Sequence, residues 1–321
     1  MSIIPVEVPQ GAIRYNTDSN KMECFDGTRW MQVSVSSPVL ANRGIRSSSG
    51  IGTDSRNEEY GGARGLFMGN FTEVSPGYTP SIDYVDISST GNAIDFGDLT
   101  EAVKYMPAGG SNETRGIRAG GVDGPNSNPF NTIDYVTIAS TGNAKDFGDL
   151  TTRQKYPISV NSPTRMLIAG GVNVPGHPSA NNTIEYLNFA TYGNTVEFGD
   201  LTQIQSAGGA GAACSSTRGI FFVEGYISSG WSSTNVINYV TMASTGNAVD
   251  FGDLTFARKN SGSTSSRTRA LCAGGYYGSS PNYTNSIEYI EIATTGNAVD
   301  FGDRTVAGSY FAGCSNAHGG L

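Results

Sequence analysis

The chain has 321 residues, and its 43 glycines are about twice the usual globular share of roughly 7%. Only 15% of the residues are charged, 37% are hydrophobic, and the net charge at pH 7 is −8. The abundant Gly, Ser, Thr and Asn exclude long helices, and the lack of a three-residue glycine period excludes collagen. The negative charge argues against a nucleic-acid partner, and the hydrophobic content excludes a disordered chain. A large, turn-rich, all-β protein remains.

The sequence also argues against a membrane span and against a metal site. No apolar run approaches the ~20 residues that a membrane helix needs, and Met1 to Pro5 has neither a basic nor a long apolar stretch. The four cysteines are far apart and match no zinc-site spacing. We therefore expect no cofactor, and cysteines that act as small buried hydrophobic residues in a reducing compartment.

The first 38 residues are predicted to form a small β-meander. Turn signals at Thr17 to Asn20 and at Asp26 to Thr28 separate three short strands. The strands are expected around residues 12–16, 21–25 and 29–34. Three short strands without a helix are barely stable alone. We therefore expect this segment to pack on the rest of the chain, on its own copies or on a different protein.

Residues 39–321 are predicted to form a second domain, built from one repeat. The segment from Ser81 to Thr100 returns at Thr132 to Thr151, and three further copies begin near Thr183, Val236 and Ser286. The repeated aromatic residues are Tyr84, Tyr135, Tyr186, Tyr239 and Tyr289, and Phe96, Phe147, Phe198, Phe251 and Phe301. Both series have gaps of 51, 51, 53 and 50 residues, which indicates five units of about 51 residues.

Each unit is predicted to contain four short strands. A run of small residues comes first, as in Ala207 to Ser216 and Arg258 to Ser266, and an apolar run ending in glycine follows. After a loop come the strand I-D-Y-V-T-I, the turn T-G-N and the strand D-F-G-D. Four strands in each of five units predict a β-propeller of five four-stranded blades. The small-residue strands would lie innermost, and the repeated Tyr and Phe would fill the wedges between blades.

The ends of the repeat array leave one strand more than five blades require. Val306 to Ser315 resembles a further innermost strand, and Val39 to Ser49 could serve the first blade in the same way. One of these segments is expected to close the ring, and the sequence does not decide which.

The strand, Gly-Gly, loop and strand pattern resembles the kelch-type propeller of kelch proteins and of the galactose oxidase family. The likeness is more specific for kelch-like proteins of marine and cyanobacterial tailed phages, whose Y-V-T-I-A-S-T-G-N-A-x-D-F-G-D-L-T units are matched by Tyr135 to Thr151 and Tyr239 to Thr255. The segment Gly11 to Trp30 resembles a hairpin module of phage tail fibres.

This resemblance implies a non-enzymatic virion protein: a tail fibre, head fibre or decoration protein. Residues 1–38 would bind other virion proteins or form a homo-oligomer, with a trimer favoured, and the propeller would bind host-surface glycan or neighbouring subunits. Two alternatives are a secreted carbohydrate-active enzyme of the galactose oxidase type and a cytoplasmic kelch-type adaptor. The enzyme has little support, because the chain has only His177 and His318 as histidines.

Two sets of residues are candidates for binding. An acidic pair recurs in each unit and could hold calcium, but structural ion pairs with the repeated arginines and turn hydrogen bonds explain it better. These pairs are Asp95/Asp98, Asp146/Asp149, Glu197/Asp200, Asp250/Asp253 and Asp300/Asp303. Aromatic residues in the loops after the Gly-Gly strands could stack on sugars or dock a protein, or merely pin the loops. These loop residues are Tyr78, Phe130, His177, Tyr226, Trp231, Tyr276, Tyr277 and Tyr283.

Overall fold

In the computed structural model, the regular elements of the described residues are all strands. The chain forms two compact units, residues 1–53 and 54–321. The residues described are 9–16, 21–32, 64–71, 78–87, 90–103, 107–123, 128–173, 180–205, 212–223, 233–278 and 282–309. Within these ranges the all-β prediction is confirmed, and no helix capable of crossing a membrane is found. The predicted boundary at residues 38 and 39 lies outside the described ranges.

The N-terminal unit contains one antiparallel sheet in the order β1-β2-β3. Its strands are β1 (Ile13–Asn16), β2 (Lys21–Phe25) and β3 (Trp30–Gln32), within two residues of the predicted bounds. Asp26 closes the β2–β3 turn, because its carboxylate accepts 2.8 Å hydrogen bonds from the backbone N–H groups of Arg29 and Thr28 and from the Thr28 hydroxyl. These bonds, that from Arg29 most of all, lower the pKa of Asp26 to about 2.

The second unit contains five repeat sheets in its described part, which we number I to V. Sheet I comprises β4 (Arg64–Phe71), β5 (Tyr78–Asp86) and β6 (Ile94–Val103). Sheet II comprises β7 (Ala108–Ser111), β8 (Arg115–Ala119), β9 (Phe130–Thr137) and β10 (Lys145–Gln154). Sheet III comprises β11 (Ile158–Asn161), β12 (Arg165–Ala169), β13 (Asn181–Asn188) and β14 (Val196–Gln205). Sheet IV comprises β15 (Ala212–Cys214), β16 (Arg218–Phe222), β17 (Thr234–Thr241) and β18 (Val249–Arg258). Sheet V comprises β19 (Gly262–Ser265), β20 (Arg269–Ala273), β23 (Ser286–Glu291) and β24 (Val299–Asp303), and a hairpin of β21 (Tyr276–Tyr277) and β22 (Asn282–Tyr283) follows β20.

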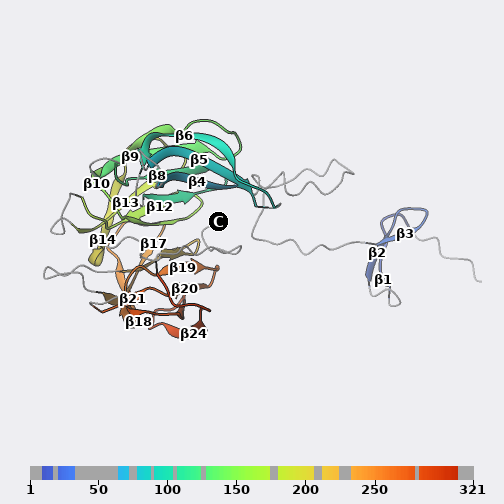
Figure 1. Cartoon of the computed structure of the whole chain (residues 1–321). Helices are drawn as coiled ribbons and strands as arrows, with labels where there is room; N and C mark the ends of the chain where they lie inside the picture. The colour runs from blue at the N-terminus through green and yellow to red at the C-terminus, as the bar shows by residue number, and fades with distance from the viewer. Residues whose placement is uncertain are drawn as a thin grey trace, which may run out of the picture. The chain divides into compact units, whose positions relative to one another are not determined.

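Sheets II to V each have the four predicted strands, paired antiparallel in chain order. The strands of sheet I match the second, third and fourth strands of the other sheets. The sheets follow one another in chain order along an arc (Figure 1). Their first strands, β7, β11, β15 and β19, contact one another in that order, and all but β11, with Ile158 and Val160, consist of small residues. Those strands therefore lie innermost, as their composition predicts.

Every sheet repeats one stack of Arg, Tyr and Phe. The guanidinium of the arginine that opens the second strand lies 4.8–5.3 Å from the centroid of the repeated tyrosine ring. That tyrosine meets the repeated phenylalanine edge-to-face, with ring centroids 5.8–5.9 Å apart. The arginines are Arg64, Arg115, Arg165, Arg218 and Arg269. These arginines stack on tyrosine instead of pairing with the repeated acids, which differs from the expectation of ion pairs.

Each sheet is joined to the next through the T-G-N turn, which in sheet III reads Tyr192-Gly193-Asn194. At the II/III junction, Gly193 N–H donates to the Phe147 carbonyl at 2.8 Å and Thr195 N–H donates to the Asp149 carbonyl at 2.9 Å. The Asn194 side chain accepts a 3.0 Å hydrogen bond from the Asp149 N–H in return. The same three bonds recur at the I/II, III/IV and IV/V junctions. The T-G-N segment is thus a docking element for the preceding sheet as well as a turn.

This docking requires a glycine in the F-G-D strand. A Cβ at Gly148 would lie 2.3 Å from the Gly193 carbonyl oxygen, and Gly148 has φ +147°. Its counterparts Gly97, Gly199 and Gly252 face the next sheet in the same way, with contacts of 2.4–2.5 Å. Only glycine allows two backbones to approach so closely.

A second connection lies deeper in each junction. The threonine that ends F-G-D-L-T hydrogen-bonds to a buried polar side chain on the third strand of the next sheet. Thr151, for example, donates to Glu185 from its hydroxyl at 2.6 Å and from its N–H at 2.9 Å. The four pairs are Thr100–Asp134, Thr151–Glu185, Thr202–Asn238 and Thr255–Glu288. Because the acceptors are buried, losing such a partner is costly.

The repeated phenylalanine packs against the next sheet at these four junctions. Phe96, Phe147, Phe198 and Phe251 are only 2–3% exposed, as the wedge prediction requires. Phe301 of sheet V differs, because it is 52% exposed. In the described part of the chain no following sheet covers it.

Gly148→Ala should destabilise the fold by roughly 2–4 kcal/mol, because the new methyl group meets backbone atoms and the positive φ is strained. Gly193→Ala is the matched control: its φ is +137°, but no atom lies within 4 Å of the new Cβ. It should cost only the strain, roughly 1–2 kcal/mol. Urea unfolding of both variants measures the difference, and equal losses would contradict the close approach.

Candidate functional site

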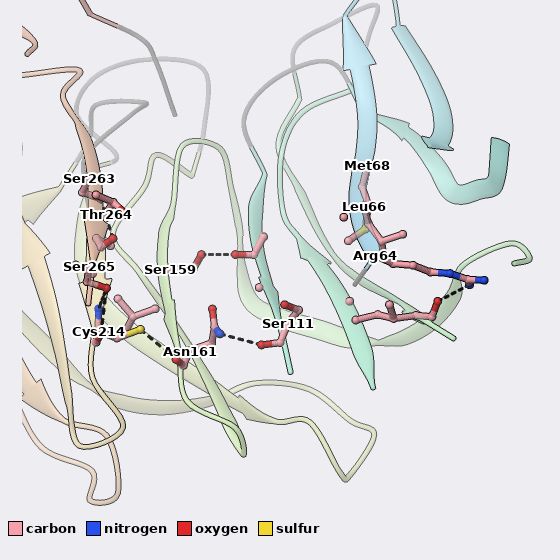
Figure 2. A pocket seen from close by; sticks show the side chains of 18 residues that line it. Arg64, Leu66, Met68, Ser111, Ser159, Asn161, Cys214, Ser263, Thr264 and Ser265 are labelled. Carbon is pink, nitrogen blue, oxygen red and sulfur yellow. Dashed lines mark hydrogen bonds between the residues drawn. The ribbon is translucent and has the colours of Figure 1, made fainter. Parts of the chain in front are cut away.

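A cavity of about 470 Å³ lies where the innermost strands meet (Figure 2). Residues of β7, β11, β15 and β19 line it, together with Arg64, Leu66 and Met68 of β4. Sheets I to V therefore border one common space, with small residues where the sheets converge.

Side-chain hydrogen bonds join neighbouring strands along the cavity wall. The Ser159 hydroxyl donates to the Gly109 carbonyl at 2.8 Å, and the Asn161 amide donates to the Ser111 carbonyl at 2.8 Å. In sheet V, Ser263 and Ser265 donate to the carbonyls of Ala212 and Cys214 at 2.8 and 3.2 Å (Figure 2). Much of the polar lining is thus used to tie one sheet to the next.

The lining is almost uncharged. Arg64 is its one charged side chain among the described residues, and its guanidinium donates a 2.8 Å hydrogen bond to the Ile138 carbonyl. Burial raises the pKa of the Cys214 thiol, whose S–H donates a 3.2 Å hydrogen bond to the Asn161 carbonyl. Cys214 is therefore a neutral thiol, not an activated nucleophile. The described part of the lining offers no acid and base pair for catalysis.

The predicted loop residues are only partly placed. His177, Tyr226 and Trp231 lie outside the described residues. Tyr78 and Phe130 begin β5 and β9 and are half-buried, and Phe130 packs against the hydrophobic core between sheets I and II. These two rings therefore help to anchor their strands.

The remaining three loop tyrosines lie on the β21–β22 hairpin, where Tyr276 and Tyr283 form a cross-strand pair on one face and Tyr277 lies on the other. The rings of Tyr276 and Tyr283 are 6.0 Å apart at their centroids, and Tyr277 lies 5.7 Å from Phe256 of β18. The Lys259 ammonium lies 5.0 Å from the Tyr276 ring centroid. Tyr277 and Tyr283 are exposed. The hairpin thus exposes one tyrosine ring on each face, while the Lys259 side chain that contacts Tyr276 is buried.

In two of the repeated acidic pairs, the first acid bonds within its own fourth strand. The carboxylates of Asp146 and Asp300 accept hydrogen bonds from the N–H groups of Gly148 and Gly302, at 3.1 and 3.3 Å. Among the described residues no group of three or more His, Cys, Asp or Glu side chains is placed to hold a metal ion. For Asp146 and Asp300 these hydrogen bonds agree with the structural interpretation of the pairs.

The buried acids of the third strands are prominent in the structure and inconspicuous in the sequence. Asp134 also pairs with Arg118, and Glu288 with Arg258, all four being buried. In the sequence the acids are only the second letter of I-D-Y or I-E-Y. Their recurrence opposite the threonine of F-G-D-L-T is a signal, but it becomes meaningful only once adjacent sheets are paired.

Comparison with known proteins identifies the fold and no family. No family model matches the chain, and no curated protein matches it. Among solved structures, YjhT superposes with a TM-score of 0.60 at 10% sequence identity, over 73% of this chain and 81% of that one. At this identity the likeness shows the fold alone, which is β-propeller-like.

Cys214 should react slowly with iodoacetamide at pH 7, because a raised thiol pKa leaves less of the reactive thiolate. The rate should rise only when the pH exceeds the usual thiol range. Peptide mapping after labelling of native and urea-unfolded protein measures this site directly. Equal labelling of Cys214 in both states at pH 7 would contradict the buried, neutral thiol.

Proposed function

We propose that this chain is a non-enzymatic structural protein of a tailed-phage virion, such as a tail fibre, head fibre or decoration protein. In this proposal residues 1–38 bind other virion proteins or further copies of the chain. The second unit is a propeller of five four-stranded blades that is displayed from the particle. The phage-like repeat units and the tail-fibre-like segment Gly11 to Trp30 motivate this assignment.

The observation that carries the proposal is the exposed apolar face of the N-terminal sheet. The register pairs Ile13 with Cys24 and Cys24 with Met31, so these side chains share one face with Tyr15. Ile13 is 64% and Met31 44% exposed. On the other face, Arg14 forms a 2.8 Å ion pair with Glu23 and covers the ring of Trp30, which packs on Phe25. A small sheet with one apolar face needs a partner to cover it.

The chemistry of the second unit also supports a binding or structural role. The polar groups of its central cavity are largely engaged in joining sheets, and the lining carries no carboxylate among the described residues. The surface of the β21–β22 hairpin, in contrast, suits a sugar ring, because aromatic faces stack on the apolar face of a sugar. We therefore assign host-surface glycan as the candidate ligand of Tyr276, Tyr277 and Tyr283.

The full chain should be present in purified virions and form a trimer in solution, and the double variant Ile13→Ser/Met31→Ser should do neither. Mass spectrometry of particles and light scattering of the isolated chain measure these outcomes. Arg29→Ser, which changes an exposed polar residue of the same unit, is the control and should behave as the parent chain. Absence of the parent chain from particles would contradict the virion assignment.

Tyr277→Ala/Tyr283→Ala should weaken binding to a host-surface glycan array by about ten-fold or more, because each stacked ring contributes roughly 1 kcal/mol. Tyr192→Ala removes another exposed tyrosine, one that lies at the II/III junction, and should leave glycan binding unchanged. Equal loss in the two variants, or no glycan bound by the parent chain, would contradict this assignment.

A further inference from the structure

The four described junctions define what each side of a sheet needs from its neighbour. One side supplies the F-G-D backbone, the buried phenylalanine and the terminal threonine. The facing side supplies the T-G-N turn, the buried acid or amide, and apolar residues of the second and third strands. The arginine of the first side also donates to a main-chain carbonyl of the facing sheet. Those carbonyls belong to Ile138, Phe189, Met242 and Ile292.

Sheet I carries an unused facing side. Phe67 and Ile87 are 61% and 69% exposed, whereas their counterparts Ile168 and Phe189, at the II/III junction, are 1% exposed. Asp83 stands at the position of Asp134 and Glu185 but is exposed. Its turn, Thr90-Gly91-Asn92, matches the T-G-N turns that dock elsewhere.

Sheet V carries the unused opposite side. Phe301 is half-exposed, Thr305 is exposed, and a Cβ at Gly302 would meet no atom within 4 Å. Arg269 forms a 2.5 Å ion pair with Glu291 of its own sheet, in contrast to the arginines of sheets I to IV. Sheet V therefore has each element that the exposed side of sheet I would need from a neighbouring sheet.

We propose that the exposed side of sheet V docks on the exposed side of sheet I of the same chain, forming a fifth junction. Gly91 and Ala93 N–H groups donate to the carbonyls of Phe301 and Asp303, and Thr305 donates to Asp83. Arg269 reaches the carbonyl of Ile87, since a guanidinium has five donors and can keep Glu291 as well. This inference rests on the five-bladed architecture and is independent of the virion role.

A substitution on sheet V supports this match. Arg304 stands where the other sheets have leucine. Between other sheets, this leucine packs in a hydrophobic cluster with the residue of the next sheet that corresponds to Phe67. Leu150 packs with Ile168 in this way, and Leu254 with Cys272. The fifth junction therefore brings Arg304 to the aromatic ring of Phe67, a favourable cation–π partner.

The partner is the same chain because both sheets already border one cavity. Residues of β4 in sheet I and of β19 in sheet V line the same 470 Å³ space. Two surfaces on one chain meet at a high effective concentration. Docking of a second copy would instead be head-to-tail and would produce open assemblies.

Amide hydrogen exchange of the full chain tests the fifth junction directly. The N–H groups of Gly91 and Ala93 should be protected to within about ten-fold of Gly142 and Ala144, which are bonded at the I/II junction. Protection should not change over a ten-fold range of protein concentration. Exchange of Gly91 and Ala93 at the rate of a free chain overturns the proposal, and protection that grows with concentration shows docking between copies.

Glycine variants give an independent measurement. Gly302 has φ +133° and Gly193 has φ +137°, and both have open space around a new Cβ. If the fifth junction forms, the urea midpoint of Gly302→Ala falls as far as that of Gly148→Ala, because the methyl group meets the backbone of Gly91. A midpoint shift equal to that of Gly193→Ala overturns the proposal. Both experiments concern the isolated chain, so their failure leaves the virion assignment standing.

Discussion

The close approach of two glycine backbones is the constraint on which the second unit depends. At each described junction the F-G-D glycine faces the glycine in the turn of the next sheet. A Cβ on the F-G-D glycine would have no room there. Three hydrogen bonds then join the fourth strand of one sheet to a turn of the following sheet. The contact sets the spacing between sheets, and the phenylalanine packing and the buried threonine bonds depend on that spacing. The high glycine content follows in part from this contact.

Buried polar pairs make each junction specific. The threonine is kept at all four described junctions, while its partner is Asp134, Glu185, Asn238 or Glu288. Two of the acids also pair with buried arginines, which balances a charge that would be expensive to bury alone. A sheet displaced by one residue would leave these groups without partners, so they oppose incorrect pairing.

This structural use of polar groups bears on function. Serine and asparagine side chains at the central cavity bond neighbouring strands, and Asp146 and Asp300 of the acidic pairs bond within their own fourth strands. Besides the exposed sides of sheets I and V, the described surfaces not engaged in this way include the apolar face of the N-terminal sheet and the tyrosines of the β21–β22 hairpin. A protein with such surfaces is suited to assembly and binding, which is why we propose a virion structural role over catalysis.

The sequence by itself determined the strand content, the repeat length and the order of strands within each sheet, because glycine, β-branched and aromatic residues recur at fixed spacing. It also indicated that small residues lie innermost. Only the tertiary structure decided how the repeated residues are used, because those contacts join residues of different repeats. The arginines stack on tyrosine and bond to the next sheet, Thr151 meets Glu185, and Phe301 is exposed while Phe147 is buried. A repeat makes each copy look equivalent, whereas burial depends on which copies have a neighbour.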